Sequence, residues 1–229
     1  MAELVPFAFL AVVVAVGGLV AYLGWKAAKE RREALAALAA QRGWQWVVRD
    51  DSWTERFGGE PFGDGSDRKA HNVLTGTYAG LPMVAFDYSY ETYSTDSKGN
   101  RTTHAHRYSV CVLRMPAWLP TVELTPENLL TRFAGKLGLG DVELESEDFN
   151  RRFRVSASDP KFAYDVLHPR TMEALLARPA VGLRIGGEDA VCWEDGTHSI
   201  LELDQRLETL HALVAGIPSF VWKDRGGTS

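Results

Sequence analysis

Two histidines one residue apart are the side chains whose spacing first suggests chemistry. His104 and His106 lie in TTHAHRYSVCV, residues 102–112. Side chains at positions i and i+2 of a strand leave the same face, so two imidazoles placed in this way can bind one metal ion. A metal site needs further ligands, and the facing strand offers Tyr90 and Thr92, which are poor zinc ligands. We therefore predict no metal site, keep His104 and His106 as its candidates, and expect them to cap an aromatic rim.

Two arginines form the second candidate site. Arg152 and Arg154 lie in FNRRFRV, residues 149–155, and leave the same side of a predicted strand. A guanidinium group offers a two-pronged donor that suits a carboxylate or a phosphate. Glu147 and Asp148 lie close by and can pair with the arginines on the surface instead. Ligand binding by Arg152 and Arg154 therefore stands as a hypothesis beside surface ion pairing.

The chain carries no recognisable catalytic motif. It contains no P-loop, no dinucleotide fingerprint, no GxSxG elbow and no HExxH pair. Cys111 and Cys192 lie in apolar strand-like contexts without CxxC spacing, which is typical of buried free thiols. We predict no catalytic residue and no cofactor, and we favour a non-catalytic protein over an enzyme.

Residues 4–25 form an uncharged, strongly apolar stretch of 22 residues. A helix of that length crosses a hydrocarbon core of roughly 30 Å. The basic cluster in residues 26–42 follows the stretch, which favours an uncleaved anchor over a signal peptide and a cytoplasmic C-terminal part. We predict a single-pass transmembrane helix at the cell membrane, with the lipid bilayer as a partner and residues 1–3 as a short external tail.

The segment after this stretch favours a second helical region. Residues 26–42 are rich in Ala, Leu, Glu, Lys and Arg, which form helices well, and Gly43 can end the helix. We expect a basic juxtamembrane helix there. Gly17 and Ala21 form a small-xxx-small pair, which predicts weak homodimerisation through the apolar helix.

Residues 43–222 are predicted to form one α+β domain, followed by a flexible tail over 223–229. The chain has 25 basic and 30 acidic residues; residues 1–42 hold five and three of them. The remainder therefore carries a formal charge of −7 and would repel a phosphate backbone. We predict no nucleic-acid partner.

The predicted domain contains a mainly antiparallel sheet with several packed helices. Alternating apolar and polar residues over 81–93 and 107–115 predict a hairpin that packs on one side. GGED, residues 186–189, predicts a turn between two further strands. Thr125 and Pro126 predict the start of a helix that runs to residue 138. Further helices are expected over residues 160–167, 169–177 and 202–215.

Three stretches resemble a known group of sequences: FGDGSDRKAHNVLTGTYAGLPMVAFDYSY (62–90), ESEDFNRRFRVSASDPKFAYDVLHPRTMEALL (145–176) and GIPSFVW (216–222). They resemble uncharacterised membrane-anchored proteins of GC-rich bacteria, a group of hypothetical proteins and domains of unknown function. The resemblance covers roughly residues 43–222. It implies one coherent domain and supplies no activity and no catalytic residue.

These observations together favour a binding function. We predict a single-pass membrane-anchored protein whose C-terminal domain is a non-catalytic binding or scaffold module at the cytoplasmic membrane face, with a membrane protein as a partner. Two alternatives stay open: a sensor domain for a small anionic or lipid-derived ligand, and a membrane-proximal hydrolase. Function depends on sites rather than on fold, so the arrangement of side chains must decide among them.

Overall fold

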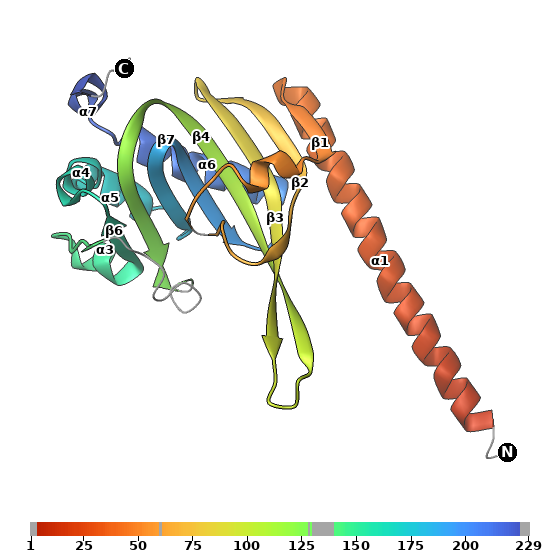
Figure 1. Cartoon of the computed structure of the whole chain (residues 1–229). Helices are drawn as coiled ribbons and strands as arrows, with labels where there is room; N and C mark the ends of the chain where they lie inside the picture. Colours follow the sequence, from red (N-terminus) through yellow and green to blue (C-terminus); the bar gives the residue numbers. More distant parts are fainter. Residues whose placement is uncertain (1–3, 60, 128, 130–139, 225–229) are drawn as a thin grey trace.

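The computed structural model describes residues 4–59, 61–127, 129 and 140–224, with side chains from Val13 onward. Figure 1 shows a long helix that runs away from a sheet against which shorter helices pack. The helices are α1 (Leu4–Arg42), η1 (Asp51–Thr54), α3 (Glu147–Arg152), α4 (Pro160–Val166), α5 (Pro169–Leu176), α6 (Ile200–Ala215) and α7 (Ser219–Asp224). The strands are β1 (Gln45–Arg49), β2 (Ser66–Tyr78), β3 (Leu81–Thr95), β4 (Arg101–Pro126), β5 (Gly140–Asp141), β6 (Phe153–Ala157) and β7 (Gly182–Asp195).

The strands form one antiparallel sheet in the order β1-β2-β3-β4-β6-β5, with β7 paired to β4. The predicted α+β class with a mainly antiparallel sheet is therefore confirmed. β3 and β4 form the predicted hairpin, in register from Met83 opposite Leu113 to Thr95 opposite Arg101. The β-branched and aromatic residues that alternate along these strands suit a pleated, buried surface.

β4 is the longest strand, with 26 residues, and it joins the two parts of the sheet. One of its edges pairs first with β3 and later with β6, while β7 lies along the opposite edge from Tyr108 to Leu124. The register of the β4–β7 pair shifts between Arg114 and Leu119. This irregularity bends β4, so that the sheet curves around the helices on one side.

One predicted element is different in the structure, and another begins slightly later than predicted. The predicted turn at residues 186–189 is wrong, because β7 continues from Gly182 to Asp195. Gly187, at a φ of 63°, pairs with Leu119 at the register shift, so the glycines form a bulge and do not reverse the chain. Thr125 and Pro126 are the last residues of β4, and the helix predicted to start there begins directly after them, because Glu127 and Leu129 are helical. Residues 128 and 130–138 of that predicted helix lie outside the described residues.

Helices cover one face of the sheet. Leu35, Leu38 and Ala39 of α1 are buried there, at the i, i+3 and i+4 spacing of an apolar helix face. α6 buries a longer stripe on the same face, and Figure 1 shows this helix behind the sheet. The stripe consists of Leu203, Leu207, Leu210 and Leu213. We call this side of the sheet the helix face.

The opposite side of the sheet is rich in aromatic rings and is covered by an irregular segment. Residues 50–59 and 61–65, here the covering segment, include η1 and lie in front of the sheet in Figure 1. Phe57 and Phe62 of this segment pack on Phe86 of β3 at ring-centroid distances of 6.2 and 6.3 Å. We call this side the aromatic face. The β3–β4 hairpin was predicted to pack on one side only. In the structure, helices cover one of its faces and the covering segment covers the other.

α1 corrects the prediction of a membrane anchor. Within the described residues, no helix is long and apolar enough to cross a membrane. The described side chains of α1 start at Val13, and Lys26, Lys29 and Glu30 follow Trp25 in the same helix. The described apolar stretch is therefore shorter than the roughly 20 residues of a membrane span.

This finding overturns the transmembrane helix predicted over residues 4–25. The single-pass location at the cell membrane is overturned with it, including the outside N-terminus and the cytoplasmic C-terminal domain. The predicted self-association through Gly17 and Ala21 stays a prediction, as does the predicted membrane-protein partner. Residues 1–3 and 225–229, which belong to the predicted terminal tails, lie outside the described residues.

Replacement of Gly182 by Ala should destabilise the fold, because a Cβ atom there would lie 2.3 Å from Cε2 of the buried Trp193 ring. We expect a loss of about 1–3 kcal/mol in the free energy of unfolding, the usual cost of overpacking a core. Urea unfolding followed by tryptophan fluorescence measures it. Gly140→Ala is the matched control, because the nearest atom to its new Cβ is 3.9 Å away. Equal stability of the two variants would contradict the packing described here.

Candidate functional site

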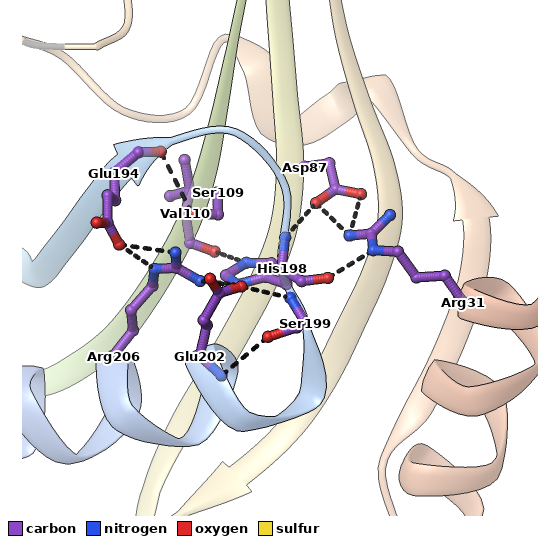
Figure 2. A network of polar contacts seen from close by, with 9 residues as sticks. All are labelled: Arg31, Asp87, Ser109, Val110, Glu194, His198, Ser199, Glu202 and Arg206. Carbon is purple, nitrogen blue, oxygen red and sulfur yellow. Dashed lines mark hydrogen bonds and ion pairs between the residues drawn. The ribbon is translucent and has the colours of Figure 1, made fainter. Parts of the chain in front are cut away.

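A cluster of charged side chains lies where α1, β3, β7 and α6 meet, and Figure 2 shows it from close by. We call it the polar junction. Its members come from distant parts of the chain: Arg31 from α1, Asp87 from β3, Glu194 from β7, His198 from the turn before α6, and Arg206 from α6. Asp87, His198 and Arg206 are all buried. A cluster of buried ionisable groups is a reasonable place to look for function.

Asp87 is the centre of one half of the junction. Arg31 Nη2 donates to both of its carboxylate oxygens at 2.7 Å, and Asn72 Nδ2 donates to one of them at 2.8 Å. The backbone N–H of His198 donates to the other oxygen at 3.1 Å. Arg31 also donates from Nε to the backbone carbonyl of His198 at 2.5 Å. Asp87 therefore connects α1, β2 and the turn before α6 to the middle of the sheet.

His198 connects the two halves of the junction as a neutral ring. Its Nε2 lies 3.1 Å from the carbonyl oxygen of Val110, which can accept only, so Nε2 carries the proton. Nδ1 then accepts from Arg206 Nη1 at 3.2 Å. Burial, which Asp87 opposes and the positive charge of Arg206 reinforces, lowers the pKa of His198 to about 4.

Arg206 completes the second half. Its Nε and Nη2 donate to Oε2 of Glu194 at 3.1 and 2.7 Å. Local sequence places this arginine: Ser199 and Glu202 form a capping box that starts α6 directly after His198. The SxxE pattern of these two residues was a readable signal for the helix start, which the apolar stripe alone placed near residue 202.

The chemistry that the polar junction can perform is limited by how fully its groups bind one another. The carboxylates accept from arginines, and the imidazole uses both of its nitrogens within the protein. Among the described residues, no group of three His, Cys, Asp or Glu side chains is placed to hold a metal ion. The arrangement suits a structural mount for α1 better than a reaction centre.

The structure places Arg152 and Arg154 in two separate structural contacts. Arg152 donates from Nη1 to the carbonyl of Leu176 at 2.7 Å and from Nη2 to the carbonyl of Arg178, so it caps the end of α5. Arg154 forms a two-pronged pair with Asp141 at 3.0 and 2.7 Å. The two guanidinium groups are thus each engaged by the protein. A ligand at these arginines stays a prediction.

His104 and His106 lie in the part of the β3–β4 hairpin that extends beyond the neighbouring strands. His104 Nε2 lies 2.9 Å from the hydroxyl of Ser94, and His106 Nε2 lies 2.8 Å from that of Thr92. His106 also stacks on Tyr90, with ring centroids 4.7 Å apart. The sequence placed both histidines on the face of Tyr90 and Thr92, and the register agrees. His106 thus extends the row of rings along the aromatic face, whereas His104 is exposed and contacts the hydroxyl of Ser94.

Replacement of Arg31 by Met should loosen α1, because the buried carboxylate of Asp87 would lose its charged partner. We expect a loss of about 2–3 kcal/mol in the free energy of unfolding, below the full cost for a buried pair because Arg31 is partly exposed. Hydrogen exchange should also become faster in residues 31–42. Lys29→Met is the control, since Lys29 pairs with Glu33 on the exposed side of the same helix. Equal exchange in both variants would show that the Arg31–Asp87 pair does not hold α1 on the sheet.

The free energy of unfolding should fall as the pH falls, because His198 is buried in its neutral form. Its folded-state pKa of about 4 lies below the ordinary 6.5, so the unfolded chain binds the proton first as the pH falls. The stability that neutral His198 contributes is complete above about pH 6.5 and is lost progressively toward pH 4, with roughly 2 kcal/mol lost by pH 5.

The variant His198→Gln removes this titration. The difference in unfolding free energy between the wild type and the variant should therefore shrink by about 2 kcal/mol from pH 7.5 to pH 5. Urea unfolding at several pH values measures both proteins under the same conditions. A difference that stays constant over this range would show that His198 does not have a depressed pKa.

Comparison with known proteins shows the fold. No family model matches this sequence, and no curated protein matches it either. The chain is similar in structure to the crystal structure of the mycobacterial trehalose monomycolate transport factor A, TtfA, with a TM-score of 0.63 and 15% sequence identity. The match covers 82% of this chain and 95% of that one. At this identity the likeness establishes a shared fold, which extends over nearly the whole of the other protein.

Proposed function

We propose that this protein is a non-catalytic binding factor that serves lipid-related transport. The observation that carries the proposal is the fold shared with TtfA, a trehalose monomycolate transport factor. The likeness includes most of this chain, so it concerns the whole arrangement rather than a common local motif. Because one fold can serve several functions, the arrangement of the side chains must support the proposal independently.

The polar junction supports a binding role. Its buried charges satisfy one another and fix the direction of α1, which is what a module that presents a helix to a partner requires. Between residues 13 and 25, α1 exposes several large apolar side chains, and such surfaces commonly mark binding sites. They are Val13, Val14, Val16, Leu19, Val20, Tyr22, Leu23 and Trp25.

The proposal predicts a transport defect without a synthesis defect. In the source organism, deletion of this protein should reduce severalfold the rate at which newly made acylated lipids, labelled with radioactive acetate, reach the cell surface. The total incorporation of label should stay the same, because a binding factor does not make the lipid. Selective extraction of the surface, followed by chromatography, measures the two quantities separately.

Complementation supplies the controls. The wild-type chain and Lys29→Met should restore lipid appearance at the surface, whereas Arg31→Met should restore it less, because the mount of α1 is weakened. Immunoblotting must show equal amounts of the three proteins. A deletion strain with normal lipid appearance would refute the proposed function. A fall in total lipid synthesis would also contradict it, because a binding factor does not make the lipid.

A further inference from the structure

A small cavity opens at the end of the aromatic face, between the covering segment and the start of β3. Its walls are mainly apolar and include Trp53 and Phe57 of the covering segment, Val84 of β3 and Val112 of β4. The two valines are buried in the aromatic face. The rings of Trp53 and Phe57 stack with centroids 6.1 Å apart. The cavity is therefore held by core packing on both sides.

The size of the cavity limits what can enter it. Its volume is about 70 Å³. A cavity of roughly 150 Å³ accommodates benzene, so this one has room for a few methylene groups but not for an aromatic ring. Each methylene group that leaves water for such an apolar space raises affinity about fourfold. The walls and the volume together favour the end of an alkyl chain.

The lining of the cavity also includes charged groups of both signs. Arg56 lies over the ring of Trp53 at 4.8 Å, and Arg114 pairs with Glu188. Asp189 is the third charged residue of the lining. Burial raises the pKa of Asp189, while Arg56 and Arg114 act against this rise. The polar end of the cavity thus offers two guanidinium groups and the carboxyl group of Asp189, while Glu188 pairs with Arg114 beside it.

Such a polar end favours an uncharged ligand with hydroxyl groups. A ligand with a net charge would meet attraction and repulsion from groups of both signs, so it gains little. A hydroxyl group can both donate and accept, and it can therefore bind to the arginines and the carboxyl groups alike. Apolar pockets with a few convergent polar groups at one end are typical of sites that orient an amphipathic molecule.

We infer that this cavity binds an uncharged alkyl or acyl sugar, with the end of the chain inside and the hydroxyl-bearing head at Arg56, Arg114 and Asp189. The inference rests on the proposed function and names the class of lipid that the protein would meet. The closing experiments use purified full-length protein and simple probes, so they do not depend on the result in cells.

A series of alkyl glucosides tests the site by its size. The full chain, labelled with 5-fluorotryptophan, is titrated with methyl, propyl, butyl, hexyl and octyl glucoside below their micelle thresholds. Fluorine NMR follows Trp53, whose signal is assigned from the Trp53→Phe variant. Affinity should rise about fourfold per methylene group from methyl to butyl and then level off, when the cavity is full. A flat series, or a rise that continues unchanged to octyl, would overturn the inference.

The charge of the head group and the cavity wall provide two further tests. Hexanoate and hexylammonium should each bind at least tenfold more weakly than hexyl glucoside. Val84→Leu should reduce the affinity for hexyl glucoside at least tenfold, because the larger side chain fills the cavity. The matched control is Val191→Leu, the same change at a buried valine of the aromatic face that does not line the cavity. Equal loss in both variants, or tighter binding of hexanoate, would count against the site.

The outcomes separate the site from the proposed function. If the glucoside series behaves as stated but deletion leaves lipid appearance at the surface unchanged, the alkyl-sugar site stands and the transport role falls. If deletion impairs lipid appearance but no glucoside binds at Trp53, the transport role stands and the ligand site is refuted. The glucoside titration uses the wild-type chain and the cell assay uses the deletion strain, so a poorly folding variant cannot leave the inference untested.

Discussion

The carboxylate of Asp87 is the interaction on which the arrangement of the structure depends. A buried carboxylate is costly unless donors surround it, and here the donors come from α1, from β2 and from the turn before α6. Those elements can supply the donors in one relative placement only. The charge at the middle of β3 therefore fixes how the N-terminal helix and the C-terminal helix lie on the same sheet face. Apolar packing on the same face, to which Leu35 of α1 and Leu210 of α6 both belong, completes the arrangement.

The two faces of the sheet differ in the side chains that cover them. Packing on the helix face holds α1 and α6 in place, and the candidate ligand cavity lies on the aromatic face. The helix face is closed by α1 and α6, whose aliphatic side chains interlock and leave the polar junction as their common anchor. The aromatic face is covered by a segment with little regular structure, whose rings rest on the rings of β3. A loop can adjust around a guest more readily than two packed helices can. The small cavity lies on this more adaptable side.

Local patterns predicted the β3–β4 hairpin well, because the alternation from Val84 to Tyr90 determines which side chains share a face. The same alternation made Asp87 appear solvent-facing, since its partner Arg31 lies 56 residues away and no local pattern reports it. Gly186 and Gly187 suggested a turn because bulges and turns use the same conformational freedom of glycine. The Arg31–Asp87 contact that holds α1 and the cavity on the aromatic face both join distant segments, so the sequence alone could not predict them. The apolar character of residues 4–25 was plain, but its interpretation as a membrane span was not sustained.

α1 behaves mechanically as a lever whose fulcrum is the Arg31–Asp87 pair. The helix continues without a break from Leu4 to Arg42, and from Arg31 back to Val13 it extends by about 27 Å. A rigid rod of that length converts a rotation of about 10° at its base into a displacement of about 5 Å at Val13. Small torques at the far end would therefore act on the packed part of α1, in which Arg31 is the anchor nearest to the exposed end. The same pair sits on the central strands of the sheet, so a pull on the helix is transmitted to β3 rather than to a loop.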